Sequence, residues 1–431
     1  MPRIVLTCFG SYGDLFPSLA IARALKTRGH APVVATSAYY RDLVLREGVG
    51  FHAVRPDLDP GDSALIARVM DPRRGTEVIL RELLAPFVRD AFEDLAPIAR
   101  DADLFVSHPI TFATRLVAET HARPWVSTVL APLSFFSAHD FPVLPPYPRA
   151  TQVLRGSASA ARAFMRLARR ITRPWIAPVE AFRQSLGLPA AGNPVYEGQF
   201  SPYGTLALFS RVLGEPQADW PPRTTETGFA FYDSDEALPL PLQRFLDGGD
   251  PPVVFTLGSS AVGAAGTFFG ESVAAVERLG CRAVLLVGRD PRNLPGRALP
   301  ASILAVEYAP HAALFRRAAV VVHHGGVGTT GQALRAGRPM LVVPHAHDQP
   351  DNARRAAQLG VARVLDARRY TARRAASHLA VLLRDVSMRA HAANAAAVVA
   401  GERGADAACD VLEGVASRPV EHYLGPRGDR G

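Results

Sequence analysis

Residues 320–352 bring an anion-binding pattern and several hydrogen-bonding side chains into one short stretch of the chain. An apolar run ends at two histidines and is followed by a glycine-rich turn and by a helical pattern that starts near Thr329. Backbone N–H groups at such a turn can surround phosphate oxygens, and the helix dipole adds partial positive charge. The expected diphosphate site consists of His323, His324, Gly325, Gly326, Gly328 and Thr329.

A second apolar run, at residues 339–344, is followed by His347, Asp348 and Gln349. Ligands of open α/β sheets bind at the carboxyl ends of the strands. We therefore expect these polar residues to lie beside the phosphate turn and to face a sugar carried on the phosphate.

The loop after the first expected strand, at residues 8–17, carries a second candidate site. Its polar atoms should lie at the carboxyl end of the first strand and face a ligand-binding cleft. There the Asp14 carboxylate can accept a proton from an attacking hydroxyl group. Ser11 can orient that hydroxyl group. The alternative is that Asp14 only caps a helix that begins at Leu15.

His108 lies in the turn after the strand expected at 103–107, so it should face the same cleft. We expect His108 to line the pocket of the acceptor, the molecule that carries the attacking hydroxyl group. The alternative is a purely structural role. The loop at 8–17 lacks the G-x-G-x-x-G pattern of dinucleotide-binding sites, and this argues against a dehydrogenase.

The composition is that of a globular protein with two domains. The chain has 431 residues, of which 48% are hydrophobic and 20% are charged, and this length is enough to bury two cores. We find no signal peptide and no apolar run long enough to span a bilayer, so we expect a cytoplasmic protein. The three cysteines have neither disulfide nor metal-ligand spacing.

The net charge of +8 raises the question of an anionic partner. Nearly all basic residues are arginine, with Lys26 the sole lysine. This bias is typical of a genome rich in G and C, so we expect no nucleic-acid partner. Between Arg162 and Arg173, arginines alternate with apolar residues as in a basic amphipathic helix. Two interpretations stay open: weak peripheral contact with a membrane, or a solvated helix that packs its apolar face on its own domain.

Strand patterns alternate with helical patterns in both halves of the chain, which is typical of α/β domains with parallel sheets. The expected strands are 3–9, 31–36, 51–54, 103–107, 125–130 and 205–209 in the first half, and 252–257, 282–287, 302–306, 319–323 and 339–343 in the second. A Pro-rich, less periodic segment separates the halves. We predict a first domain at 1–215, a linker at 216–250, a second domain at 251–395, a final helix at 396–418 and a tail at 419–431.

The chain resembles the family 1 glycosyltransferases of the two-domain GT-B fold over nearly its whole length. The resemblance is carried by an H-x-G-x-x-[ST] motif at 324–329 and by the D-Q pair at 348–349. The loop at 10–14 is similar to that of rhamnolipid rhamnosyltransferase, vancomycin-type and sterol glycosyltransferases. The resemblance implies two Rossmann-like domains that face a cleft. It also implies that His324 contacts the donor diphosphate, while Asp348 and Gln349 bind the sugar hydroxyls and the final helix returns to the first domain.

The resemblance extends the donor site to four further residues. Ser259 matches a residue that contacts phosphate or sugar from the opposite wall. Tyr308 and His311 occupy the place of a W-x-P-Q element that contacts the nucleoside, although Tyr308 has a core aromatic role as its alternative. Gln332 stands where plant relatives carry a Glu that binds both ribose hydroxyls. The change from Glu to Gln is compatible with a dTDP-sugar donor, and a UDP-sugar donor stays open.

The expected activity is therefore an inverting transfer of a hexose or deoxyhexose from a nucleotide diphosphate sugar to a hydroxyl of a lipid-like or natural-product acceptor. Three D-x-D pairs superficially match a metal-binding motif: Asp57 and Asp59, Asp101 and Asp103, Asp233 and Asp235. We expect these acids to be solvated residues of loops. We therefore expect neither a metal site nor a cofactor. The expected partners are the sugar donor and a hydrophobic hydroxylated acceptor, in a monomer or homodimer. Two alternatives stay open, a nucleotide-sugar epimerase of the same fold and a catalytically silent homologue that binds a sugar nucleotide.

Overall fold

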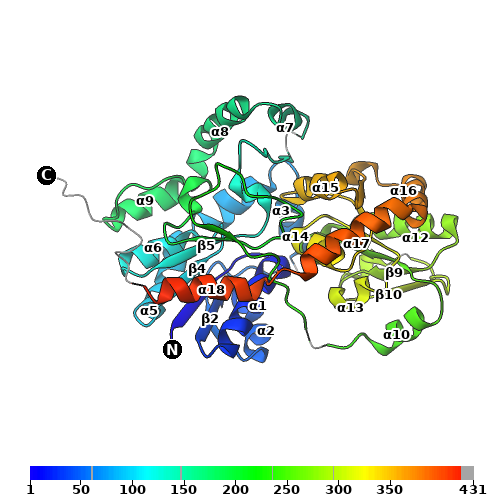
Figure 1. Ribbon diagram of the computed structural model, residues 1–431, viewed down its shortest axis with the longest axis horizontal. Coiled ribbons are helices and arrows are strands. Elements are labelled where there is room, and N and C mark those ends of the chain that lie inside the picture. The colour runs from blue at the N-terminus through cyan, green and yellow to red at the C-terminus, as the bar shows by residue number, and fades with distance from the viewer. Residues whose placement is uncertain (60–61, 146–147, 235, 295, 419–431) are drawn as a thin grey trace.

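In the computed structural model, which describes residues 1–59, 62–145, 148–234, 236–294 and 296–418, the chain folds into two α/β domains that lie side by side (Figure 1). Each domain is built on one parallel sheet, and the expected α/β fold with two Rossmann-like domains is confirmed. Among the described residues, no helix combines the length and the hydropathy needed to cross a membrane.

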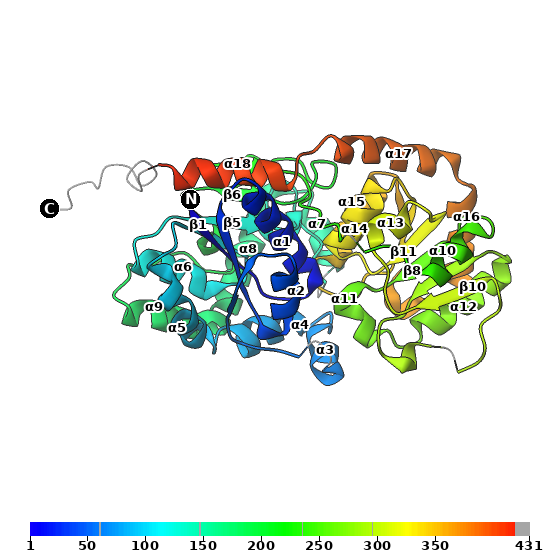
Figure 2. The same cartoon turned by 90° about the horizontal axis from the view of Figure 1, so that it is seen from below.

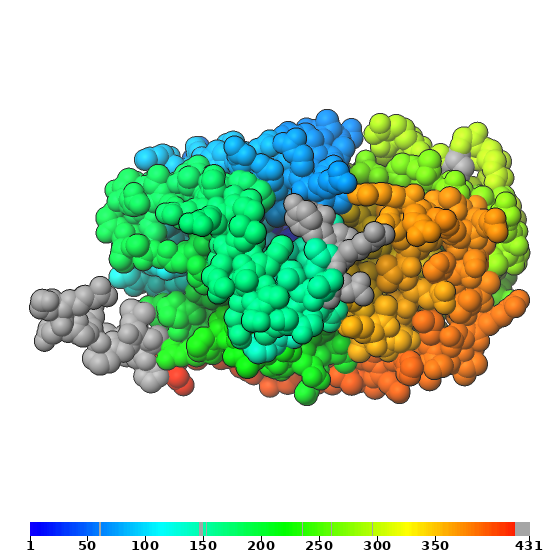
Figure 3. All heavy atoms as spheres, turned by 90° about the horizontal axis from the view of Figure 1, so that it is seen from above, coloured from blue at the N-terminus to red at the C-terminus, as the bar shows by residue number. Residues whose placement is uncertain are grey.

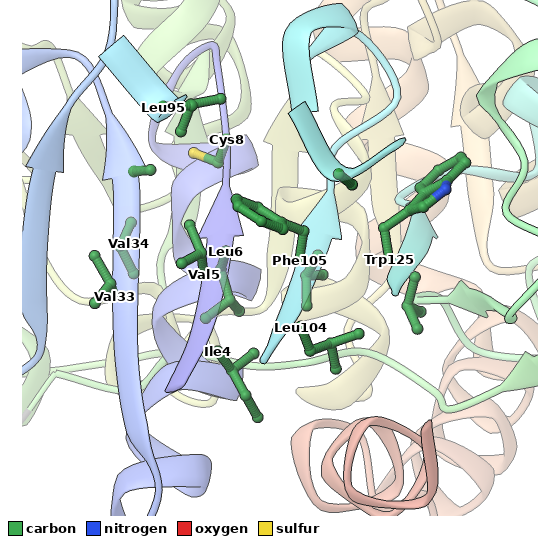
Figure 4. Packing of buried hydrophobic residues seen from close by; sticks show 14 of the residues in the cluster. Ile4, Val5, Leu6, Cys8, Val33, Val34, Leu95, Leu104, Phe105 and Trp125 are labelled. Carbon is green, nitrogen blue, oxygen red and sulfur yellow. The ribbon is translucent and has the colours of Figure 1, made fainter. Parts of the chain in front are cut away.

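The first sheet has its topological switch at β1. Its strand order is β3 (Gly50–Ala53), β2 (Ala31–Thr36), β1 (Arg3–Thr7), β4 (Leu104–Ser107), β5 (Trp125–Val129), β6 (Thr205–Ala207) and β7 (Thr224–Glu226). Because β1 lies between β2 and β4, the loops after β1 and β4 leave the same edge of the sheet side by side. Apolar side chains such as Ile4 and Phe105 fill the core beside these strands (Figure 4).

Helices surround this sheet. They are α1 (Tyr12–Thr27), α2 (Arg41–Arg46), α3 (Ser63–Val69), α4 (Gly75–Glu77), α5 (Val88–Ala99), α6 (Phe112–Thr120), α7 (Pro148–Leu154), α8 (Ala158–Thr172) and α9 (Ala177–Ser185). A π-helical turn at Val78–Leu84 precedes α5. The helices α7 and α8 project from the first domain at the top of Figure 1.

The second sheet repeats the design with its switch at β8. Its strand order is β10 (Ile303–Val306), β9 (Ala283–Leu286), β8 (Val253–Thr256), β11 (Val320–His323), β12 (Met340–Val342) and β13 (Ala362–Val364). The helices of this half are α10 (Leu240–Asp247), α11 (Gly258–Ala261), α12 (Phe268–Leu279), α13 (His311–Phe315), α14 (Val327–Arg335), α15 (Gln349–Gln358), α16 (Ala372–Arg384) and α17 (Val386–Ala400). The turns after β8, β11 and β12 therefore meet at one edge of the sheet.

Two strands were not expected from the sequence. β7 lies within the segment 216–250, which also holds α10, and pairs with β6 at the edge of the first sheet. β13 forms the edge of the second sheet. Each has only three residues, and Thr224–Glu226 is polar throughout. Strand patterns are recognised over at least four residues, so neither segment could be identified.

The end of the described chain crosses between the domains. α17 packs against α14 of the second domain, and α18 (Ala405–Ala416) packs against α1 of the first, as Figures 1 and 2 show. Arg28, the C-cap residue of α1, forms ion pairs with Asp406, Asp410 and Glu413 of α18. The expected tail at 419–431 lies outside the described residues.

The domains also touch beside the cleft. Met70, at the end of α3, is buried in the core of the second domain, and Ile66 packs against Gly263. On the other side, the buried carboxylate of Asp351 in α15 accepts a hydrogen bond from the N–H group of Val143 (3.0 Å). Asp351 also pairs with Arg355 (2.6 Å), so α15 is tied through a buried charge to the Pro-rich loop at residues 139–145 of the first domain.

Candidate functional site

The turn after β11 is shaped by glycines that pack closely around one histidine ring. Gly325 has φ of +92°, and a Cβ added to Gly326 would lie 2.4 Å from Nε2 of His324. A side chain at either position would therefore strain the turn or displace the ring. Gly326 is also the N-cap of α14 and provides no capping side chain, so the first turn of this helix is suited to an anion.

The two histidines of this turn have different environments. His323 is fully buried, and its Nδ1 accepts a hydrogen bond from the N–H group of Gly325 (3.1 Å), which places the ring proton on Nε2. Burial lowers the pKa of His323 to about 3. Burial also lowers the pKa of His324 well below its usual range, and Nδ1 of His324 has no partner among the described residues. Both rings are neutral at pH 7, so His324 can meet a diphosphate as a hydrogen-bond donor, whereas His323 supports the turn.

The turn after β8 lies against the same ring. Gly258 has φ of +63°, and a Cβ added there would lie 2.6 Å from Cε1 of His324. Ser259, the next residue, is exposed at the start of α11. The structure therefore brings Ser259 next to the diphosphate turn, as expected, and α11 also contacts α1 of the first domain.

Asp348 is connected to the phosphate turn through a residue that the sequence reasoning missed. Asn352, one helical turn further along α15, donates to Asp348 Oδ2 (2.6 Å) and to the carbonyl oxygen of Gly325 (2.9 Å). Burial raises the pKa of Asp348 to about 7, the hydrogen bond from Asn352 lowers it, and the negative charge of Asp14 raises it further. The four-residue spacing of Asp348 and Asn352, which places two residues on one face of a helix, was the signal that could have revealed this pair.

Gln349 is 2% exposed, and its carbonyl oxygen is already engaged. It accepts hydrogen bonds from the N–H groups of His345 (2.8 Å) and Ala346 (3.0 Å). These two hydrogen bonds hold the loop after β12 in place. The side-chain amide nitrogen of Gln349 is then the group that can donate a hydrogen bond to a ligand. The ring of the neighbouring His347 and the carbonyl oxygen of Val69 in α3 both lie against Gly75, so the loop also contacts the first domain.

Asp14 lies in a capping box at the start of α1. The helix begins at Tyr12, Ser11 is its N-cap, and the N–H group of Ser11 donates to Asp14 Oδ2 (2.8 Å). The side chain of Ser11 accepts from the N–H group of Gly13 (3.2 Å) and donates to Asp14 Oδ2 (3.2 Å). The alternative of a helix that begins at Leu15 with Asp14 as its N-cap is therefore wrong, because Asp14 occupies the third helical position of the box.

The second carboxylate oxygen of Asp14 faces His108. Asp14 Oδ1 lies 3.4 Å from Nε2 of His108, and neither ring nitrogen of His108 has a hydrogen-bond partner among the described residues. Because β1 and β4 are neighbours, their loops bring the two side chains together. The sequence placed both residues at the cleft but did not pair them, since the pairing depends on strand order.

The residues expected at the nucleoside lie on α14 and on the neighbouring α13 segment. Tyr308 is 48% exposed, so its alternative as a core aromatic residue is not supported. The His311 ring stacks on Phe315 (4.6 Å between centroids), and burial lowers the pKa of His311 to about 4. Gln332 lies on α14, and its buried carbonyl oxygen has no partner among the described residues. Because α13 contacts α14, these side chains are grouped beside the helix that begins at the phosphate turn.

A small apolar cavity of about 40 Å³ lies next to the loop of Asp14 in the first domain. Phe9 and Ile110, which flank the loops of Asp14 and His108, line it together with Leu84, Phe87 and Val88. A volume of this size is too small for a whole polycyclic molecule, since even a benzene molecule needs a larger cavity of roughly 150 Å³.

The acids of the D-x-D pairs have other partners. Asp103 accepts from the N–H group of Arg3 (2.7 Å), and Asp57 accepts from the hydroxyl of Ser37. Asp233 pairs with Arg335 (2.6 Å), while Asp235 lies outside the described residues. Among the described residues, no group of three or more His, Cys, Asp or Glu side chains has the placement to hold a metal ion.

Comparison with known proteins places this site in a family. Residues 274–409 match the family described as erythromycin biosynthesis protein CIII-like, C-terminal domain. Over 425 residues the chain is 33% identical to O-mycaminosyltylonolide 6-deoxyallosyltransferase of Streptomyces fradiae, which covers 95% of this chain and 97% of the relative. It is 29% identical to a sterol 3-beta-glucosyltransferase of Aspergillus terreus over 83% of this chain, but spans only 26% of that protein.

The fold matches a solved enzyme structure. The glycosyltransferase VinC in complex with dTDP superposes with a TM-score of 0.70 at 22% sequence identity, covering 97% of this chain and all of VinC. Three findings point to the same family: the two facing Rossmann-like domains, the H-x-G-x-x-T turn and the whole-length similarity to a 6-deoxyallosyltransferase. The chain belongs to the family 1 glycosyltransferases of GT-B fold and is an enzyme that transfers a sugar.

Proposed function

We propose that this enzyme transfers a hexose or deoxyhexose from a dTDP- or UDP-sugar to a hydroxyl group of a hydrophobic natural-product or lipid-like acceptor, with inversion and without a metal ion. The observation that carries the proposal is the contact of α1, whose first turn holds Asp14, with α11 and α14, the helices that begin at the turns after β8 and β11. Burial raises the pKa of Asp348, and the charge of Asp14 raises it further. A candidate base of the first domain therefore lies beside the candidate donor site of the second.

In the proposed reaction, the acceptor hydroxyl gives its proton to Asp14 while its oxygen attacks the anomeric carbon. The bond from that carbon to the diphosphate oxygen breaks in the same displacement, so the configuration inverts. The departing diphosphate collects negative charge, which the N-terminus of α14, His324 and Ser259 stabilise through hydrogen bonds and the helix dipole. These groups provide the stabilisation without a metal ion.

Three observations favour dTDP over UDP. The solved structure of VinC holds dTDP, and the relative from Streptomyces fradiae is a 6-deoxyallosyltransferase by name. In addition, Gln332 takes the place of the Glu that holds both ribose hydroxyls in plant relatives, and a deoxyribose has only one of these. For the acceptor, the sterol 3-beta-glucosyltransferase of Aspergillus terreus acts on a sterol by name, and this similarity supports a hydrophobic hydroxylated molecule.

A product assay separates the proposal from its alternatives. Purified enzyme is incubated with dTDP- and UDP-sugars, with and without hydroxylated aglycones and lipids, and the products are identified by mass spectrometry. Sugar transfer is demonstrated if the products include a glycosylated acceptor and an equal amount of released nucleotide diphosphate. An epimerase would isomerise the donor without an acceptor, and a silent homologue would bind the donor without consuming it.

Replacing Asp348 by Ala is expected to weaken binding of the intact donor by about tenfold or more, because a buried sugar hydroxyl loses its partner at a cost of roughly 1–3 kcal/mol. Binding of free dTDP should change little. Since the pKa of Asp348 is about 7, the ionised carboxylate forms as the pH rises through neutrality. Donor affinity relative to dTDP affinity should therefore rise between about pH 6 and pH 8.

Isothermal titration of each ligand across this range measures the effect, and Asp348→Asn serves as the control without a titrating group. Equal losses for donor and free dTDP would remove Asp348 from the sugar site. For Gln349→Ala we expect losses with both ligands, because its carbonyl oxygen also holds the N–H groups of His345 and Ala346.

Replacing His108 by Ala is expected to lower kcat by about tenfold, because it removes the polar neighbour of Asp14 Oδ1. His108→Gln should restore most of the loss, since its amide can donate to the same oxygen. Steady-state kinetics across pH provide the measurement. A rise in KM with unchanged kcat and an unchanged pH profile would instead place His108 in the acceptor pocket alone.

A further inference from the structure

The outward face of α8 combines arginines with exposed aliphatic side chains. The helix contains no acidic residue between Ala158 and Thr172. Arg162, Arg166 and Arg170 follow one another at intervals of four residues and therefore form one row along the helix. Beside this row lie Leu167, which is 55% exposed, and Ile171, which is 60% exposed.

The inner face of α8 has its own core, so the exposed face is not needed to hold the helix. Ala161 and Met165 are buried against Phe141 and Tyr196 in a small hydrophobic cluster. The interpretation of a solvated helix that packs its apolar face on its own domain accounts for these residues. It does not account for Leu167 and Ile171, which point outward.

None of the three arginines of the row has an acidic partner among the described residues. Arg162 donates to Nε2 of His139 (3.1 Å), whereas Arg166 and Arg170 are exposed and form no ion pair within the described chain. The arginines outside the row are paired, Arg169 with Glu197 (3.1 Å) and Arg173 with Glu180 (3.4 Å). Unpaired guanidinium groups beside exposed aliphatic side chains complement a surface that is anionic outside and apolar beneath. A bilayer with anionic headgroups has these properties.

We propose that the outward face of α8 binds an anionic lipid bilayer. In this arrangement Leu167 and Ile171 enter the boundary between headgroups and acyl chains, while Arg166 and Arg170 bind lipid phosphates, which guanidinium groups match with two parallel hydrogen bonds. The position of the helix suits this contact, because α7 and α8 stand out from one face of the molecule (Figures 1 and 3). The neighbouring helix α7 carries a further exposed aliphatic side chain, Val153, which is 79% exposed.

The contact would also reach the cleft. The inner face of α8 packs on Phe141 and Leu144 of the Pro-rich loop. The same loop donates through Val143 to Asp351, on the helix that begins at the sugar motif. Binding at α8 would therefore place the cleft beside the lipid surface, where hydrophobic hydroxylated molecules gather.

Vesicle flotation tests the proposal with the full chain. Vesicles of phosphatidylcholine alone are compared with vesicles that also contain phosphatidylglycerol, at low and at physiological salt. Binding should require phosphatidylglycerol and weaken with salt. Each basic residue near an anionic surface strengthens binding by roughly fivefold, so Arg166→Gln with Arg170→Gln should lower affinity by roughly thirtyfold. Leu167→Ser with Ile171→Ser should lower it while the salt dependence remains.

The matched control replaces two exposed arginines of the second domain, Arg278→Gln with Arg373→Gln, which changes the net charge equally. This variant should bind as the unchanged protein does, and thermal melting verifies the fold of every variant. Three results would overturn the proposal: no binding to either vesicle at low salt, full binding by the α8 arginine variant, or equal losses in the control variant. The first result would leave an acidic protein as the partner that fits this face.

Discussion

Replacing Asp14 by Asn is expected to lower kcat by at least about a hundredfold, because general-base catalysis typically contributes that much. The substitution keeps the size of the side chain and an oxygen that can accept from the N–H group of Ser11, so the start of α1 should remain folded. Affinity for the nucleotide sugar should therefore stay nearly unchanged. Steady-state kinetics and donor titration by calorimetry measure the two quantities separately.

Ser11→Ala is the matched control for this experiment. It removes the hydroxyl that accepts from Gly13 and donates to Asp14 Oδ2 but leaves the carboxylate in place. Its loss of turnover should be much smaller than that of Asp14→Asn. Near-normal turnover of Asp14→Asn would reduce Asp14 to a member of the capping box.

Replacing His324 by Ala is expected to weaken dTDP binding and also to slow transfer by about a hundredfold or more, the usual effect of removing one donor from a developing negative charge. Burial lowers the pKa of this histidine well below its usual range, so the ring acts as a neutral donor. Its contribution should therefore persist at a pH where an ordinary histidine is already deprotonated. Calorimetry with dTDP and single-turnover kinetics with the full donor provide the two readouts.

His323→Ala separates the roles of the two neighbouring rings. Since Nδ1 of His323 accepts from the N–H group of Gly325, its loss should lower the melting temperature more than that of His324. Unchanged dTDP affinity in His324→Ala, together with lost affinity in His323→Ala, would move the diphosphate contact to His323. The double variant then shows whether the two effects are independent.

The central strands of both sheets could be predicted from the sequence because they are continuous apolar runs. β1 and β11 are examples, and each is buried on both faces, as strands of a parallel sheet are. β7 and β13 escaped prediction because an edge strand of three residues has almost no pattern. The start of α1 at Tyr12 was also missed, although Ser11 and Asp14 have the spacing of a capping box.

In the candidate site, contacts between neighbouring residues could be predicted from the sequence, whereas contacts between distant segments could not. His324 and Gly326 belong to one turn, so the sequence alone brings them together. The approach of His108 to Asp14 depends on the order of β1 and β4, which no local pattern encodes. The link from Asn352 to the carbonyl oxygen of Gly325 likewise depends on how α15 packs against the phosphate turn.

The most direct test of the proposed transfer is the product formed from a dTDP-deoxyhexose and a panel of hydroxylated aglycones in the presence of EDTA. We expect an acceptor that gains the mass of one sugar, an equal amount of released dTDP and an inverted anomeric configuration by NMR. We also expect that Asp14→Asn abolishes most of this product while still binding the donor. Donor that is bound but never transferred to any acceptor, or transfer that proceeds unchanged in Asp14→Asn, would contradict the proposal.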